Sequence, residues 1–170
     1  MKVHFVKKAR KDYPEDGIKK GESYYWWKPR YGGIRRSKTY PSRQELTQSE
    51  FLCRVYDIED ELSVIRTQIE TNIEGKNKEE IEELIRDALE MIIIEIGELR
   101  DECEDKLYNM PKQLQDTSEA GILLQERIDA LEDWISELEN IDISIEDDDD
   151  IQERVEEILD EISECGYRGD

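Results

Sequence analysis

The sequence predicts a mainly α-helical protein in which a small N-terminal three-stranded antiparallel β-sheet is followed by an elongated antiparallel helical bundle or coiled coil. Two observations predict this fold class. The charge changes sign along the chain, and the hydrophobic spacing changes from a period of two residues to a period of seven. We expect three long helices and one shorter helix in the helical part.

The charge divides the 170 residues into two segments. Residues 1–43 hold 13 Lys or Arg against 4 Asp or Glu, which gives a formal charge of +9. Residues 44–170 hold 11 against 41, which gives −30. We therefore expect a basic aromatic β-hairpin module over residues 1–43 and an acidic α-helical bundle over residues 44–170.

Three runs in the basic segment have the composition of strands. Apolar and polar residues alternate over residues 2–7, and strand-forming residues fill ESYYWWKPRY at 22–31 and IRRSKTY at 34–40. The glycine pair Gly32-Gly33 suits a two-residue hairpin turn, because such turns need positive φ angles. Pro29 is expected at an edge or a bulge, since proline cannot donate to the sheet ladder.

The acidic segment has helical periodicity. A first helix is expected over residues 44–74, a second that stops before Pro111, a third that ends near Asn140 and begins as early as Pro111, and a fourth, shorter helix before Gly166. The apolar stripe on each predicted helix is narrow. The sequence is therefore compatible with a monomer and equally with a homodimer whose helices pack between chains. The apolar positions are Phe51, Val55, Ile58, Leu62, Ile65 and Ile69; Ile81, Ile85, Ala88, Ile92, Leu99, Cys103 and Leu107; Leu124, Ile128, Leu131, Ile135 and Leu138; and Ile151, Val155, Ile158 and Ile162.

The aromatic and basic residues of the hairpin form the candidate binding site. A sheet face that combines Trp with Arg and Lys can pair with phosphates and stack on bases or sugars. The alternatives are that the aromatic residues form the core of a small sheet, or that the cations contact an acidic protein surface. The candidate residues are Trp26, Trp27, Lys28, Arg30, Arg35, Arg36 and Lys38.

The acidic helices suggest a second kind of site. An elongated body with a charge of −30 can imitate DNA, which carries one negative charge per roughly 1.7 Å of duplex axis. The alternative is an ordinary solvated face with some acid–base pairing along the helix, such as Glu82 with Arg86. Acidic residues outnumber basic ones almost four to one here, which is more than such pairing requires.

The sequence offers little support for catalysis. His4 is the only histidine, so Ser-His and Cys-His nucleophile systems, two-histidine metal sites and histidine general bases are not expected. The four aspartates at 147–150 lack the spacing of a calcium loop, so we expect helix capping there rather than Ca²⁺ binding. Cys53, Cys103 and Cys165 are expected to be buried or half-buried thiols. We expect a non-enzyme with no metal and no cofactor.

No N-terminal segment shows the basic start and apolar run of a signal peptide, so we expect none, and no apolar stretch approaches the roughly 18 to 20 residues that a membrane span needs. A soluble protein of the cytoplasm that makes no membrane contact is therefore expected.

Residues 19–51, with the sequence KKGESYYWWKPRYGGIRRSKTYPSRQELTQSEF, resemble the opening of a group of small uncharacterised proteins of tailed phages and prophages. The resemblance covers about a fifth of the chain and implies a phage-encoded protein that acts in the cytoplasm of a bacterial host. It transfers no functional residues. The predicted sheet is also similar, by fold analogy, to the three-stranded arm-binding domains of phage integrases, although the catalytic residues of a recombinase are absent.

Three functional hypotheses follow. The first is a non-enzymatic phage-type interaction protein that binds and modulates or inhibits a host protein, or a nucleic-acid-processing or defence complex, through an acidic helical surface that imitates DNA. The second is a DNA- or RNA-binding accessory protein that uses the basic hairpin and dimerises through its helices. The third is a structural phage component whose helices assemble into a larger particle.

Overall fold

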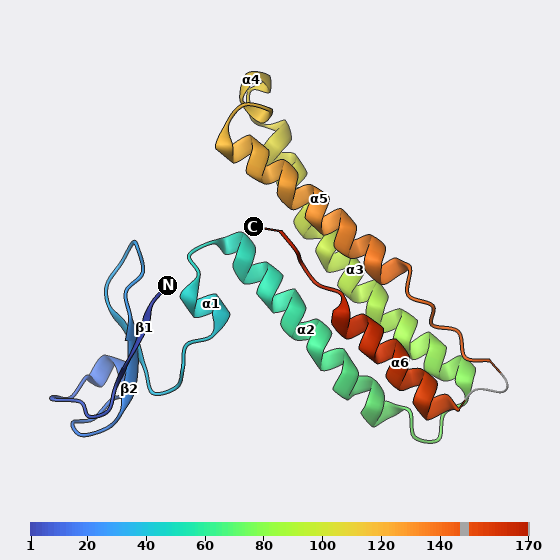
Figure 1. The fold of residues 1–170 in the computed structure, drawn as a ribbon, viewed down its shortest axis with the longest axis horizontal. Helices are drawn as coiled ribbons and strands as arrows, with labels where there is room; N and C mark the ends of the chain where they lie inside the picture. The colour runs from blue at the N-terminus through green and yellow to red at the C-terminus, as the bar shows by residue number, and fades with distance from the viewer. Residues whose placement is uncertain (147–149, 170) are drawn as a thin grey trace. The chain divides into compact units, whose positions relative to one another are not determined.

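The computed structural model describes residues 1–146 and 150–169. The chain forms two compact units, Met1–Tyr56 and Asp57–Asp170, which we call the sheet unit and the helical unit (Figure 1). The sheet unit contains 14 Lys or Arg and 6 Asp or Glu, a charge of +8, and the helical unit contains 10 and 39, a charge of −29. The opposite charges of the two sequence segments are therefore carried by two different folds.

The sheet unit contains the predicted three-stranded antiparallel sheet. Its strands are β1 (Val3–Val6), β2 (Tyr24–Trp27) and β3 (Arg35–Ser37), and β2 lies in the centre. Phe5 pairs with Tyr25, and Tyr25 pairs in turn with Ser37. A short 3-10 helix, η1 (Pro14–Asp16), lies between β1 and β2.

One face of the sheet has a small core of its own. Tyr24 is buried together with Ala9 and Ile18, and Val6, Tyr13 and Trp26 pack against these three residues. Backbone hydrogen bonds hold the β1–β2 connection over this face, from Ala9 N to Glu22 O at 2.7 Å and from Gly21 N to Ala9 O at 2.9 Å. A three-stranded sheet gains independent stability when one of its faces is covered in this way.

The prediction of a two-residue hairpin turn at Gly32-Gly33 is wrong. Trp27 pairs with Arg35, so residues 28–34 form a longer loop, and only Gly32 of the glycine pair has a positive φ angle. Pro29 lies in this loop, buried, rather than at an edge or a bulge. The physical reason is that β2 is the central strand and donates backbone hydrogen bonds to both β1 and β3. Proline has no backbone N–H to donate, so the strand ends before Pro29.

The helix predicted over residues 44–74 is in fact two helices, α1 (Arg43–Leu46) and α2 (Glu50–Asn72). Thr47 is extended, and its hydroxyl accepts from Ser49 N at 3.1 Å, while the Ser49 hydroxyl accepts from Leu52 N at 3.3 Å. Ser and Thr compete with the helix for backbone groups in this way, and Ser49 begins a new helix. The apolar stripe predicted for α2 is confirmed, because all six of its residues are buried.

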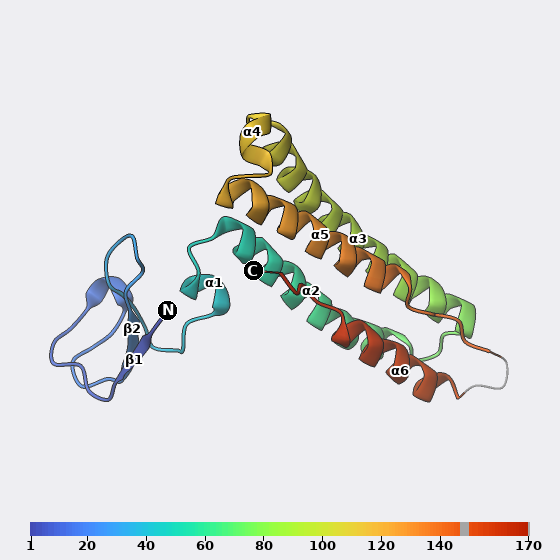
Figure 2. The ribbon, with the colours of Figure 1, turned by 45° about the horizontal axis from the view of Figure 1, so that its top comes forward.

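The helical unit continues with α3 (Lys78–Tyr108), α4 (Lys112–Gln115), α5 (Glu119–Glu139) and α6 (Ile151–Glu164). Figures 1 and 2 show α3 and α5 side by side, and α6 beside α2. An ion pair of 2.6 Å between Arg66 Nη2 and Asp160 Oδ1 joins α2 to α6. The predicted mainly helical fold with long antiparallel helices is confirmed.

Two details of the third predicted helix differ from the structure. The chain turns between α4 and α5, where a Cβ atom on Gly121 would collide with the carbonyl oxygen of Gln115, so the residue at this corner has to be glycine. Further along, Trp134 is 1% exposed, whereas Ile135 is only half-buried. The heptad pattern selected Ile135, but Trp134 also lies at helical spacing from the buried core, three residues after Leu131 and four before Leu138.

The capping expected before the last helix is confirmed for Asp150, whose carboxylate accepts from the backbone of Gln152 and Glu153. The other three aspartates of this run, 147–149, lie outside the described residues. Cys103 is buried and Cys53 and Cys165 are half-buried, as expected. Among the described residues, no helix combines the length and the apolar composition that a membrane span requires.

Candidate interaction surfaces

The two tryptophans predicted to bind nucleic acid have structural contacts in the sheet unit. Trp27 is 2% exposed, and its indole N–H donates to the carbonyl oxygen of Glu45 at 3.2 Å. Trp26 is half-buried and stacks on His4, with ring centroids 4.3 Å apart and planes inclined by 12°. The two indoles point to opposite faces of the sheet, so they do not form one stacking platform.

Two of the predicted cations also have partners within the sheet unit. Arg36 lies 3.3 Å from the Asp16 carboxylate, and its guanidinium stacks over the Tyr13 ring at 4.2 Å from the centroid. Lys38 Nζ lies 3.0 Å from Glu22 Oε2. The Lys19 backbone N–H and the Lys38 ammonium lower the pKa of Glu22. These contacts tie β3 to the β1–β2 connection.

The remaining three candidates, Lys28, Arg30 and Arg35, are exposed around the 28–34 loop. Tyr31, at the centre of this loop, is 72% exposed, and its backbone is held by Gln48, whose amide donates to Tyr31 O at 2.7 Å. The structure therefore separates the predicted set into four residues that contact other parts of the sheet unit and three exposed ones, of which Arg30 lies over the ring of the adjacent Tyr31, 5.6 Å from its centroid.

The helical unit presents a large excess of carboxylates, and several of its ten cations are paired with acidic side chains of the same unit. Arg66 pairs with Glu70 and Asp160, and these contacts raise the pKa of its guanidinium. Arg154 lies 3.2 Å from Glu157, and Arg168 lies 2.8 Å from Glu137. Lys106 and Arg100 also have carboxylates within 4 Å. With 39 carboxylates in this unit, most of the acidic charge remains uncompensated.

Acidic residues form a row along α3. The row lies on the exposed side of the helix, at steps of three, four or eight residues, which places its members within one face. We call these residues the α3 acidic row: Glu83, Asp87, Glu90, Glu98 and Asp101.

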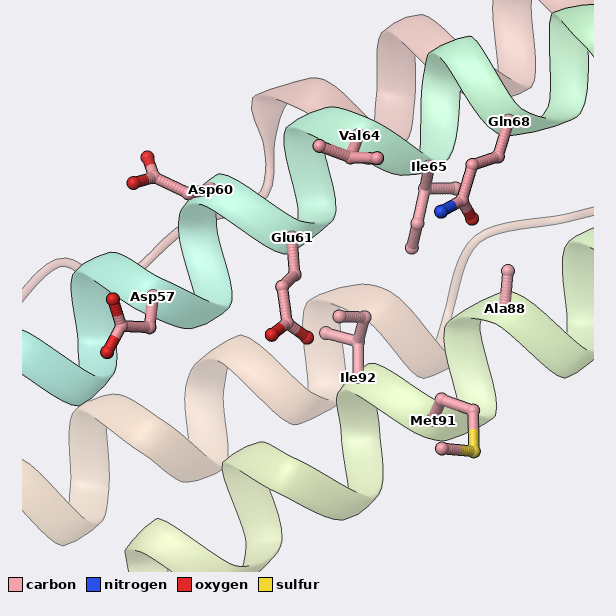
Figure 3. A pocket seen from close by; sticks show the side chains of 9 residues that line it. All are labelled: Asp57, Asp60, Glu61, Val64, Ile65, Gln68, Ala88, Met91 and Ile92. Atoms are coloured by element: carbon pink, nitrogen blue, oxygen red, sulfur yellow. The ribbon is translucent and has the colours of Figure 1, made fainter.

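A groove of about 650 Å³ lies between α2 and α3 (Figure 3). Its floor contains the buried residues Ile65 and Ile92. Val64 on α2 and Met91 on α3 form its sides and are 48% and 61% exposed. Figure 3 shows the Glu61 side chain extending from α2 toward Ile92. The remaining lining residues are Asp57, Asp60, Gln68 and Ala88.

The groove therefore combines two chemistries. Apolar side chains line its floor and sides, and the carboxylates Asp57, Asp60 and Glu61 line it on α2. Exposed apolar side chains next to charged borders are typical of surfaces that bind other proteins. We refer to this feature as the α2–α3 groove.

A second cavity, of about 430 Å³, lies between α5 and the C-terminal residues 166 and 168. Trp134 Nε1 and Glu137 Oε2 are buried there without a hydrogen-bond partner among the described residues. Burial and the nearby Glu137 carboxylate raise the pKa of the Cys165 thiol, which makes it a weak nucleophile.

Across residues 1–146 and 150–169, no group of three or more His, Cys, Asp or Glu is arranged to hold a metal ion. The chain matches no protein-family model, no curated protein and no solved structure.

Sequence reasoning missed the α2–α3 groove. Val64 and Met91 lie off the heptad stripes, where the pattern predicts solvent-exposed positions, and an isolated exposed apolar residue is ordinary. The sequence carried a weak signal only, since Val64 precedes the stripe residue Ile65 and Met91 begins the apolar run 91–94. The packing of two helices was needed to bring the two side chains to one groove.

Proposed function

We propose that this protein is a non-enzymatic interaction protein that binds a basic host protein, or a nucleic-acid-processing or defence complex, through the acidic surface of its helical unit, in the manner of a phage-encoded inhibitor. The observation that carries the proposal is the uncompensated charge of −29 on that unit. Its proposed site of action is the cytoplasm of a bacterial host.

The amount of charge supports imitation of DNA. The 31 residues of α3 span about 46 Å at roughly 1.5 Å per residue. A duplex of that length carries about 27 phosphate charges at roughly 1.7 Å per charge. The helical unit therefore has about the total charge of the DNA segment whose length it matches, and it can compete for a basic channel.

The contacts within the sheet unit also support the proposal. Trp27, Arg36 and Lys38 have intramolecular partners, so they are committed to the sheet rather than to a nucleic acid. The second candidate function, binding of DNA or RNA, depends on the exposed residues Lys28, Arg30 and Arg35.

Affinity capture from bacterial lysate, with and without nuclease, tests the proposal. A variant of the α3 acidic row, Glu83→Gln/Asp87→Asn/Glu90→Gln/Glu98→Gln, should lose a protein partner whose capture survives nuclease treatment. A scattered variant, Glu126→Gln/Glu139→Gln/Glu156→Gln/Glu161→Gln, removes the same charge from α5 and α6 and should retain it. Failure to capture any nuclease-resistant protein would refute the proposal.

Fluorescence anisotropy with labelled DNA and RNA at low salt tests the second candidate. Under our proposal the full chain binds neither, because its net charge of −21 repels phosphate. Salt-dependent binding that is lost in Arg30→Ala/Arg35→Ala would instead establish the second function.

A further inference from the structure

We infer that the α2–α3 groove is a docking site for a basic amphipathic helix of a partner protein. This inference rests on the proposed function, because it assigns the way in which the acidic helical unit contacts its partner. It adds an apolar component to an interaction that charge imitation alone would leave purely electrostatic.

The apolar component comes from the exposed sides of the groove. Val64 and Met91 are 48% and 61% exposed, and they flank Ile65 and Ile92, which are 5% and 4% exposed. An occupant that covers Val64 and Met91 would extend the core outward from these two isoleucines. The charged backbone of DNA offers no aliphatic side chains for such burial, so the groove favours protein over DNA.

The length of the groove suits a short helix. Its lining on α2 runs from Asp57 to Gln68, which corresponds to about 16 Å at roughly 1.5 Å per residue. About three turns of helix cover this distance and present apolar anchors at positions i, i+4 and i+7 to one groove. A helix laid between two helices also repeats the packing by which bundles are built.

The charge around the groove selects a basic occupant. Asp57, Asp60 and Glu61 line the groove on α2, and the α3 acidic row lies on the exposed side of α3, the helix that forms the other wall. Lysine and arginine on the polar face of the occupant would pair with these carboxylates. An acidic helix would be repelled, and a second copy of this groove would be repelled for the same reason.

The probe that tests this inference is a fluorescein-labelled peptide of about 14 residues composed of leucine and lysine at helical spacing. Its first control has the same composition in a scrambled order without a helical period, and its second has glutamate in place of lysine. Anisotropy titrations of the full chain should give salt-dependent binding of the first peptide, at least about tenfold weaker binding of the scrambled one, and no binding of the acidic one.

Matched variants locate the binding. Val64→Ser/Met91→Ser removes the exposed sides of the groove and should weaken binding about tenfold or more. Ile122→Ser changes a residue on α5 of similar exposure, 45%, and should leave the affinity unchanged. Glu61→Gln should weaken binding several-fold, whereas Glu126→Gln, on α5, should not.

Equal binding of the helical and scrambled peptides, or unchanged binding by Val64→Ser/Met91→Ser, would overturn the inference. Sedimentation of the same variants completes the test, because a dimer that Val64→Ser/Met91→Ser converts to a monomer would assign the groove to a second copy and would also overturn it. In either case, loss of the captured partner in the variant of the α3 acidic row would still uphold the proposed function, so the two failures are distinguishable.

Discussion

The sheet unit and the helical unit both carry a strong charge, but they use it differently. In the sheet unit, Arg36 and Lys38 are bound to Asp16 and Glu22, and Trp27 donates to the backbone of α1. In the helical unit, several cations such as Arg66 and Arg154 are paired with carboxylates, and the carboxylates remain in large excess. The comparison teaches that the same compositional signal indicates internal packing in one region and an external partner in the other.

The largest expected effects come from Trp27 and Trp134, the fully buried tryptophans of the sheet unit and the helical unit. Trp27→Ala and Trp134→Ala should each cost about 3–5 kcal/mol, the usual range for removing a buried tryptophan. Hydrogen exchange measured by mass spectrometry on the full chain should show faster exchange of β2 and β3 in the first variant, and of α3 and α5 in the second. Equal acceleration in both units by either variant would contradict the division into two units.

Replacement of the same tryptophans by phenylalanine sharpens the comparison. Trp27→Phe loses the hydrogen bond to Glu45 O, whereas Trp134→Phe removes an indole N–H that has no partner among the described residues. The free energy of unfolding should therefore fall further for Trp27→Phe, by about 1 kcal/mol relative to Trp134→Phe. Denaturant titrations of the two variants measure this difference, and a larger loss for Trp134→Phe would show that its N–H is bonded.

Added salt should slow hydrogen exchange more in the helical unit than in the sheet unit. Raising NaCl from about 0.01 M to 1 M shortens the screening length from about 30 Å to 3 Å, which reduces repulsion among the carboxylates. Exchange in α3 and α5 should become slower, because a charge of −29 destabilises the compact helical unit. Exchange in β2 and β3 should change less. A larger change in the sheet unit would show that the acidic excess has little energetic effect.

The smallest expected effect is the pH response of Glu22. Its folded-state pKa lies below its ordinary value of 4.5, so its ionised form stabilises the sheet unit above that pH. This contribution is lost as the pH falls through the lowered pKa. In the wild type, hydrogen exchange in β3, corrected for the intrinsic effect of pH, should become faster as the pH falls through the lowered pKa of Glu22, and Glu22→Gln should abolish this acceleration. If β3 exchange in the variant still accelerates to the same extent, other carboxylates cause the effect.

The sequence predicted the parts of the fold that depend on repeated spacing. The stripe of α2 from Phe51 to Ile69 is buried throughout, because each of its residues recurs at helical intervals. Features that depend on a few residues, such as turns and helix breaks, were harder to predict. The Gly32-Gly33 pair resembled a tight turn, but the demands of the central strand on Pro29 and Trp27 set a longer loop. Thr47 and Ser49 divided a continuous apolar pattern into two helices.

The candidate sites were less predictable than the fold. Trp27 and Lys28 are adjacent in the sequence, yet one is buried and the other exposed, and only the strand pairing determines which. The α2–α3 groove depends on residues of two consecutive helices that only their packing brings together. No local pattern identifies Val64 and Met91 as neighbours, so the groove became visible only in the folded structure.

Hydrogen exchange of the full chain with and without its captured partner tests the central claim most directly. Our account expects slower exchange over residues 57–68 and 83–101, where the α2–α3 groove and the α3 acidic row lie, and unchanged exchange over residues 24–38. Protection confined to residues 24–38, with none in α2 or α3, would contradict it and would assign the interaction to the basic sheet unit.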